Sequence, residues 1–234
     1  MKMLKTYLVN MDWNPQRLAF MKEQLDRFGI EFERFPGIAG ASFKGAALRK
    51  VFSPVRSLIA LRKKMTAGQL GDTLSHLAIY HKMIDGGVPA ALIFEDDGVL
   101  APFFPKQVEE VEKFLDPAKP QVFLFDGYGT DIDESTPPGI RPAKNAWCTE
   151  CYICTLAAAK LLVAKNEPVV VVCDSWKRFR RWFGLELYHV VPLAVTQADA
   201  RFGSDIPVEE KVGSWLVRQI LWIIDFFLIK ITGR

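Results

Sequence analysis

The sequence predicts one α/β domain built on a central, mostly parallel sheet, followed by a C-terminal amphipathic helix. The chain has 234 residues, of which 50% are hydrophobic, and this is enough to bury one large core. It opens with an apolar strand, a helix and a second strand, the βαβ order typical of parallel sheets. A later apolar strand ends in consecutive acids, where open α/β sheets bind their ligands.

The opening of the chain alternates strands and helices. Residues 5–11 predict a strand, and residues 14–29 predict a helix with Pro15 near its start and Gly29 at its end. Residues 30–38 alternate apolar and polar side chains, as a second strand does. The prediction of a parallel sheet rests on this βαβ unit.

The remaining elements follow from similar patterns. The basic stretch 41–64 contains glycine and proline and predicts a loop or short helices. Residues 66–87 predict a helix that ends at two glycines, and residues 90–94 predict the strand before the acids. Further on, residues 146–162 alternate like a strand and then continue as a helix, while 169–173 resemble an apolar strand.

Three consecutive acids, Glu95, Asp96 and Asp97, follow the strand at 90–94. Carboxylates this close repel one another and need water or a cation to screen them. At the end of a parallel strand they suit a hard divalent cation that also binds a diphosphate. A solvated acidic turn is the alternative interpretation.

The four cysteines are expected to be thiols. Cys148, Cys151 and Cys154 have the spacing of a metal or iron–sulfur site. Strand alternation, however, points Cys151 away from the other two, which favours small buried hydrophobes instead. Cys173 has no neighbouring cysteine in the sequence.

Basic residues are unevenly placed. Residues 41–64 carry seven Lys or Arg and no acid, and residues 176–183 interleave four bases with four aromatics. No recognisable nucleic-acid module accompanies them, so we expect an anionic membrane or a phosphorylated acceptor rather than nucleic acid. The first ten residues lack the features of a signal peptide, which predicts a cytoplasmic protein.

Several blocks resemble glycosyltransferase family 25, in the right order over about 200 residues. They are "YLVNMDWNPQRLAFMKEQLDRFGIEFERFPGIAG", "GQLGDTLSHLAIYHKMI", "ALIFEDDGVL", "CTECYICTLAAAKLL" and "PVVVVCDSW". The resemblance implies a GT-A-like nucleotide-sugar-binding fold, a UDP-sugar donor and Mn²⁺ (or Mg²⁺). It further implies inverting transfer of a sugar, galactose by preference, to a lipooligosaccharide.

The same resemblance assigns site residues. Asp97 is the first candidate for the metal, with Glu95 beside it, and Asp96 belongs to the same donor-binding region. Asn10 and Arg17 would lie near the nucleotide. The chain departs from the family pattern at Asp72, where small or cysteine residues are common, and at Glu150 and Cys151.

The chemistry requires a base, because the acceptor hydroxyl must lose a proton as it attacks. Asp174, Asp126 and Glu150 are the candidates, with Asp174 slightly preferred, and each could instead be a structural acid that caps a turn. Ser75 and His76 fall in a helix interior. His76 could contact the donor phosphate or orient the acids, or it could simply bond a backbone carbonyl.

The C-terminal segment 212–234 follows a catalytic domain at 1–211. Drawn as a helix, it places Ser214, Arg218, Asp225 and Thr232 on one polar stripe and apolar side chains over most of the rest. The preferred interpretation is an interfacial helix on the cytoplasmic face of the inner membrane, near a lipid-linked oligosaccharide acceptor. Packing on the domain or on a second subunit is the alternative.

Two other functions remain open at this level. A nucleotidyltransferase also uses strand-end acids and a cation, but the N-terminal region lacks its glycine-rich phosphate loop. A membrane-associated nucleotide-sugar-binding protein without turnover would keep the fold and the acids. Release of UDP, release of pyrophosphate, or neither would separate the three.

Overall fold

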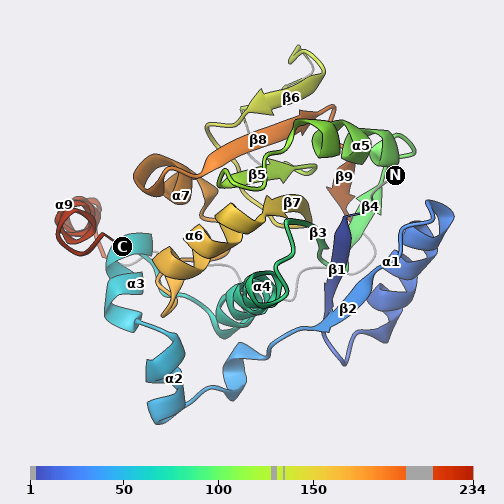
Figure 1. Ribbon diagram of the computed structural model, residues 1–234. Helices are drawn as coiled ribbons and strands as arrows, with labels where there is room; N and C mark the ends of the chain where they lie inside the picture. Colours follow the sequence, from blue (N-terminus) through green and yellow to red (C-terminus); the bar gives the residue numbers. More distant parts are fainter. Residues whose placement is uncertain (1–3, 128–130, 134, 199–212, 234) are drawn as a thin grey trace.

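The computed structural model describes residues 4–127, 131–133, 135–198 and 213–233. Within these residues the chain forms a three-layered α/β/α sandwich around a seven-stranded sheet (Figure 1). The α/β class and the mostly parallel sheet are as predicted, since five of the seven strands run in one direction.

The sheet has the strand order β2-β1-β3-β7-β5-β8-β6. The antiparallel strands are β7 and β6, while β2, β1, β3, β5 and β8 share the opposite direction. The strands are β1 (Lys5–Asn10), β2 (Glu33–Pro36), β3 (Ala90–Phe94), β5 (Gln121–Leu124), β6 (Gly139–Pro142), β7 (Cys151–Thr155) and β8 (Glu186–Val191). A separate antiparallel pair joins β4 (Gly98–Leu100) to β9 (Val195–Gln197).

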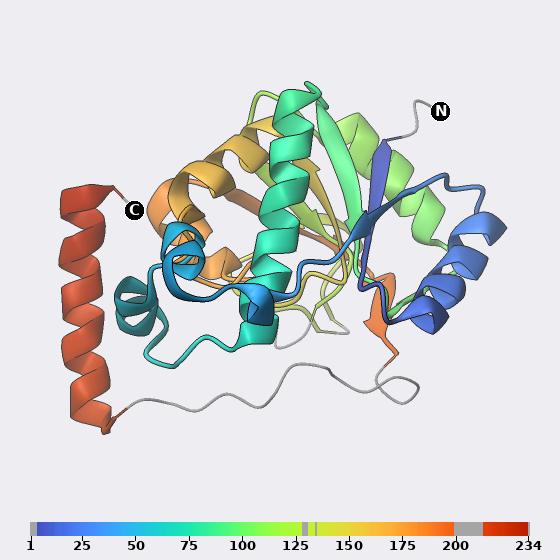
Figure 2. The same cartoon turned by 90° about the horizontal axis from the view of Figure 1, so that it is seen from below.

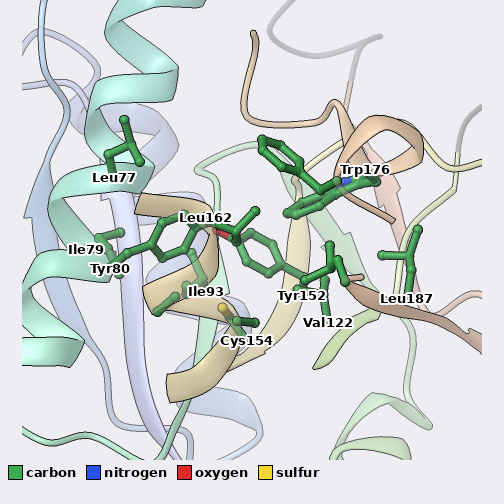
Figure 3. Close-up of a cluster of buried hydrophobic side chains, with 14 of the residues drawn as sticks. Leu77, Ile79, Tyr80, Ile93, Val122, Tyr152, Cys154, Leu162, Trp176 and Leu187 are labelled. Carbon is green, nitrogen blue, oxygen red and sulfur yellow. The ribbon is translucent and has the colours of Figure 1, made fainter. Parts of the chain in front are cut away.

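Helices cover both faces of the sheet because the strands are apolar on both sides. One apolar core lies under α4 (Ala67–Asp85), α6 (Leu156–Asn166) and α7 (Trp176–Phe183). The other lies under α1 (Pro15–Arg27) and α5 (Phe104–Phe114). Figure 3 shows Tyr80 and Tyr152 in the first core, with Leu77, Leu162 and Trp176 around them.

The strand and helix predictions for the first half of the chain are confirmed with small shifts of their ends. The basic stretch 41–64 forms short helices, namely η1 (Gly40–Ser42), α2 (Gly45–Val51) and α3 (Pro54–Leu61). Thr66 caps α4 in a reciprocal capping box with Gln69, which fixes where the long helix begins.

The apolar segment 169–173 is not a strand, and that prediction is wrong. Only Val169 makes a sheet-like bridge, to Phe52. The Asn166 side chain instead bonds the amides of Val170 and Val171 and the Val171 carbonyl. A buried side-chain amide therefore satisfies backbone groups that a neighbouring strand would otherwise satisfy.

The helix α9 (Trp215–Thr232) stands at the outside of the molecule, beside α3 (Figure 2). It contacts the domain through Asp225 and Ile229, which are buried, and through Phe226, whose ring packs on Trp182 of α7. Asp225 is buried against Arg178, and Arg56 donates to Thr232. Among the described residues, no helix combines the length and apolarity that a bilayer crossing requires. The predicted boundary at 211–212 lies outside the described residues.

Candidate active site

A cavity of about 590 Å³ opens where β1 and β3 end, against the first turns of α4. Its wall contains six of the predicted site residues: Asn10, Arg17, Ser75, Glu95, Asp96 and Asp97. The segment 38–41, the first turn of α4 at 67–68, Asp72, Trp13 and Gln197 border it as well. Strand-end placement thus brings together residues that are up to 87 positions apart, from Asn10 to Asp97.

Arg17 of α1 reaches across the cavity wall to the acids after β3. Its Nη1 atom lies 3.2 Å from Asp96 Oδ1 and 3.1 Å from Asp97 Oδ2. One guanidinium therefore links two adjacent carboxylates, and all three side chains are largely buried. The like-charge repulsion noted in the sequence is relieved in part by this internal cation.

Asn10, the last residue of β1, holds Asp96 in place. Its Nδ2 atom donates to Asp96 Oδ2 at 2.6 Å and to the Asn14 carbonyl at 2.9 Å. Its Oδ1 atom accepts from Arg34 Nε at 3.0 Å. Because these bonds engage both ends of the amide, Asn10 orients the acid cluster as well as lining the cavity.

Ser75, on α4, bonds the helix to the segment 38–41, which forms one wall of the cavity. Its hydroxyl accepts from the Ile38 amide and donates to the Gly71 carbonyl, each at 2.8 Å. Gly71 and Gly40 bring the two backbones together: a Cβ on Gly71 would lie 2.2 Å from the Ile38 oxygen, and one on Gly40 would lie 2.1 Å from the Ala67 oxygen. Sequence reasoning assigned neither glycine this role, although glycine is the residue that lets two backbones approach so closely.

Trp13 and Gln197 also border the cavity and were not predicted. Trp13 is 64% exposed at the cavity wall, and Gln197 arrives from the distant β9. A tryptophan in a polar loop is an observable signal, since most tryptophans are buried. No local pattern placed Gln197 near the acids, because the β4–β9 pairing brings it there.

His76 lies behind the cavity and is completely buried. Its Nε2 atom is 3.4 Å from Asp72 Oδ1 and 3.6 Å from Glu95 Oε1. Burial alone would lower the pKa of His76, but the neighbouring carboxylates of Asp72 and Glu95 raise it to about 10. A pKa this high favours the protonated ring, which places a second positive charge beside two acids.

The other side of His76 is fixed by two tyrosines. Its Nδ1 atom lies 2.6 Å from the Tyr152 hydroxyl, which lies 2.7 Å from the Tyr80 hydroxyl. A protonated ring donates to Tyr152, which can then donate to Tyr80. The two tyrosines approach each other in Figure 3.

The three candidate bases lie deeper than the cavity wall and border the same buried acids. Asp126 and Glu150 are within hydrogen-bonding reach of each other, and burial together with the charges of Glu150, Asp126 and Asp174 raises the pKa of the Cys148 thiol. Glu95 is adjacent to this group, since Thr149 donates to it and its charge affects all three acids. None of the three lines the cavity itself.

The three candidate bases differ in pKa. Burial and the neighbouring Asp126 raise the pKa of Glu150 to about 11, so Glu150 holds a proton at neutral pH. Burial also raises the pKa of Asp126 to about 6, and the amide of Cys151 donates to it at 3.0 Å. Burial and the charge of Asp72 raise the pKa of Asp174 to about 6. Asp174 is the least buried of the three bases.

Four carboxylates border the donor side of the site: Asp72, Glu95, Asp96 and Asp97. Among the described residues, Arg17 and His76 are the cations beside these four carboxylates, so acids outnumber bases at this point. Hard oxygen donors with this balance fit one divalent cation such as Mn²⁺ or Mg²⁺. Glu95 and Asp97 would hold it, and the ion would supply electrostatic stabilisation to a departing diphosphate.

A second possible ligand set contains Asp72, His76 and Cys173, whose ligand atoms lie within 4.8 Å of one another. The Cys173 thiol donates to Asp72 at 2.8 Å, and burial raises its pKa well above the ordinary value. An imidazole and a thiol suit softer metals than Mn²⁺. The three side chains form a hydrogen-bonded network that needs no ion.

The structure places Cys151 and Cys154 on opposite faces of the sheet, so these two thiols do not converge on one ion. Cys151 packs in the core under α1 and α5, whereas Cys154 packs in the core under α4 and α6. All four cysteines are free thiols. The interpretation as buried hydrophobes is confirmed for Cys151 and Cys154.

The chain belongs to glycosyltransferase family 25. The profile of that family, described as "Glycosyltransferase family 25 (LPS biosynthesis protein)", matches residues 3–131. This range contains every residue that lines the cavity at the ends of β1 and β3 except Gln197. Glu150, Asp174 and α9 lie beyond it.

Curated relatives carry the same family name. A "Glycosyltransferase 25 family member" of Drosophila melanogaster is 27% identical over 182 residues, covering 74% of this chain and 30% of that protein. One of Aedes aegypti is 31% identical over 108 residues, covering 45% of this chain and 18% of that protein. The chain thus matches less than a third of the length of these relatives.

A solved glycosyltransferase involved in glycosylation of the major capsid of PBCV-1 is also similar. It has a TM-score of 0.36 and 8% identity, and the match covers 77% of this chain and 76% of that chain.

Proposed function

We propose that this chain is a metal-dependent glycosyltransferase that takes a UDP-sugar donor in the cavity at the ends of β1 and β3. The observation that carries the proposal is the convergence of four carboxylates, Arg17 and the start of α4 on one cavity. Its volume of about 590 Å³ is within the usual range for small-molecule sites. Membership of family 25 supports the same reaction class.

The donor diphosphate would lie between the divalent cation and the first turn of α4. Glu95 and Asp97 would hold the cation, and the N-terminal end of α4 carries a partial positive charge that favours a negative group. Arg17 would then be shared between the acids and the phosphates, since a guanidinium has five donors. Trp13 offers an exposed aromatic face to the nucleotide base.

Asp174 is proposed as the base that accepts the proton of the acceptor hydroxyl. With a pKa of about 6 it is ionised at neutral pH yet remains more basic than an ordinary aspartate. Glu150 is protonated, and Asp126 is engaged by the Cys151 amide, so both are positioned as supports for the site. Inversion at the anomeric carbon would follow from direct attack opposite the leaving diphosphate.

The proposed identities of the donor sugar and the acceptor rest on the family alone. Galactose and a lipooligosaccharide are what the resemblance implies, and the family description names LPS biosynthesis. Nothing in the geometry of the cavity distinguishes galactose from another hexose.

A product assay separates this function from its two rivals. The purified chain is incubated with UDP-galactose or with UTP, each with Mn²⁺ or with a chelator. UDP release that requires Mn²⁺ supports the transferase, and pyrophosphate release from UTP supports the nucleotidyltransferase. UDP-galactose binding without any product supports a binding protein without turnover.

A further inference from the structure

A second cavity, of about 580 Å³, lies between α3, α7 and α9. Six cationic side chains line it: Arg62, Lys63, Lys177, Arg178, Arg181 and Arg218. Among the described residues, the one acid in its wall is Asp225, which both terminal nitrogens of Arg178 contact. The cavity therefore carries a strong net positive charge that the proposed transfer reaction does not use.

The helix α9 borders this cavity with its polar side and exposes its apolar side. Its exposed apolar residues include Trp215 at 67%, Leu216 at 61% and Phe227 at 56%. An ordinary packed helix buries most of its apolar residues, whereas Ile229 is the one apolar residue of α9 that is buried. Contiguous apolar surface of this kind marks a site of interaction.

Trp222 joins the two features, because it lines the cavity and is also 43% exposed. Tryptophan is enriched at the level of lipid headgroups, where one edge meets water and the other meets hydrocarbon. A cationic cavity directly beside an apolar helix face matches the two chemical parts of one ligand, a phosphate headgroup and its acyl chains.

We propose that this face docks on an anionic bilayer, with one lipid phosphate in the cavity and the apolar side of α9 in the outer acyl region. The inference stands apart from the transfer reaction, since membrane binding needs no turnover. A second copy of the chain is disfavoured as the occupant, because a symmetric contact would oppose two cationic rims. A soluble phosphate compound would leave the apolar face uncovered.

The cavity lies close in the chain to Asp174, the proposed base. Val172 and Ser175 line the cavity and flank Asp174 in the chain. Lys63, also in the wall, lies close enough to lower the pKa of Asp174. If Asp174 is the base, as proposed above, docking at this face would place the bilayer close to the segment that carries it.

Vesicle flotation tests the proposal with the full chain. Vesicles of phosphatidylcholine alone are compared with vesicles that also contain phosphatidylglycerol. We expect flotation only with the anionic vesicles, and we expect Lys177→Glu/Arg181→Glu to weaken binding at least about tenfold. Lys106→Glu/Lys113→Glu on α5 makes the same change in net charge and should float as the wild type does.

The apolar contact is tested with Ile220→Gln/Phe227→Gln, which alters outward side chains and spares the contacts to α3 and α7. This variant should lose flotation while keeping the wild-type melting temperature and UDP release. Equal flotation of the α7 and α5 charge variants would overturn the proposal. So would a concentration-dependent dimer that Ile220→Gln/Phe227→Gln abolishes, because a second copy would then cover the face. Saturation by glycerol phosphate without any flotation would assign the cavity to soluble phosphates instead.

Discussion

Arg17 Nη1 lies 3.1 Å from Asp97 Oδ2, so the residue proposed to hold the cation is already engaged by a guanidinium. The same nitrogen contacts Asp96 at 3.2 Å. Removing one carboxylate from this arrangement leaves Arg17 a remaining partner, which preserves the fold around the cavity. Loss of function in such a variant would therefore report on the cation and the donor rather than on folding.

Asp97→Ala is expected to abolish metal-dependent UDP binding and to lower transfer by at least about 10²-fold, while circular dichroism remains unchanged. Asp26→Ala on the exposed side of α1 is the matched control and should behave as wild type. Transfer near the wild-type rate in Asp97→Ala would show that the cation site is elsewhere.

Asp174→Asn is expected to leave UDP affinity unchanged and to slow transfer by about 10²-fold, the scale of lost general-base help. In the wild type, kcat/KM should rise as pH increases through about 6, because the carboxylate must be ionised to accept a proton. The variant should lack that rise. If its rate and pH profile match the wild type, the role passes to Asp126 or Glu150.

Glu150→Gln is expected to stabilise the protein at alkaline pH. The raised pKa of Glu150 means that the folded chain keeps a proton which the unfolded chain releases, so stability is lost as pH rises above the ordinary pKa of a glutamate. Glutamine is neutral and has no such loss. The melting temperature of the variant should therefore exceed that of the wild type by a margin that grows from pH 5 to pH 9, at about 2–4 °C per kcal/mol. Parallel melting curves across this range would contradict the assignment of a protonated Glu150.

Gly71→Ala is expected to destabilise the protein and weaken UDP binding. In an ordinary helix interior this change is favourable by about 1 kcal/mol, but here the new Cβ would lie 2.2 Å from the Ile38 oxygen. Relief of the clash must move the segment 38–41 away from α4. Gly37→Ala is the control, since its Cβ would meet the flexible side chain of Met11. If Gly71→Ala and Gly37→Ala have the same stability and UDP affinity, Gly71 does not position the segment 38–41.

Much of the fold could be predicted because its signals are local. The helix at 66–87 and the strand at 90–94 were recognisable from periodicity and glycine stops, and the acids were placed correctly at the strand end. The strand prediction for 169–173 was wrong because apolar β-branched residues favour a sheet in general. Here the Asn166 side chain accepts from the amides of Val170 and Val171 and donates to the Val171 carbonyl instead. A side-chain bond of this kind leaves no periodic pattern.

Several residues that line the cavity could be predicted, but Trp13, Gln197 and the contacts among the acids could not. Strand ends brought Asn10 and the acids to one cavity, as expected from topology. The pairing of His76 with Asp72 and Glu95, and the close contact of Gly40 with the first turn of α4, depend on long-range packing. The orientation of α9 was hidden for the same reason, because an amphipathic pattern does not say which face meets the protein.

Isothermal titration of UDP into the chain, with Mn²⁺ and then with a chelator, tests the central claim most directly. The account predicts binding that requires Mn²⁺, disappears in Asp97→Ala and persists in Asp174→Asn. UDP binding of equal strength in the presence of the chelator, or binding that survives Asp97→Ala unchanged, would contradict a metal-dependent nucleotide-sugar site at the end of β3.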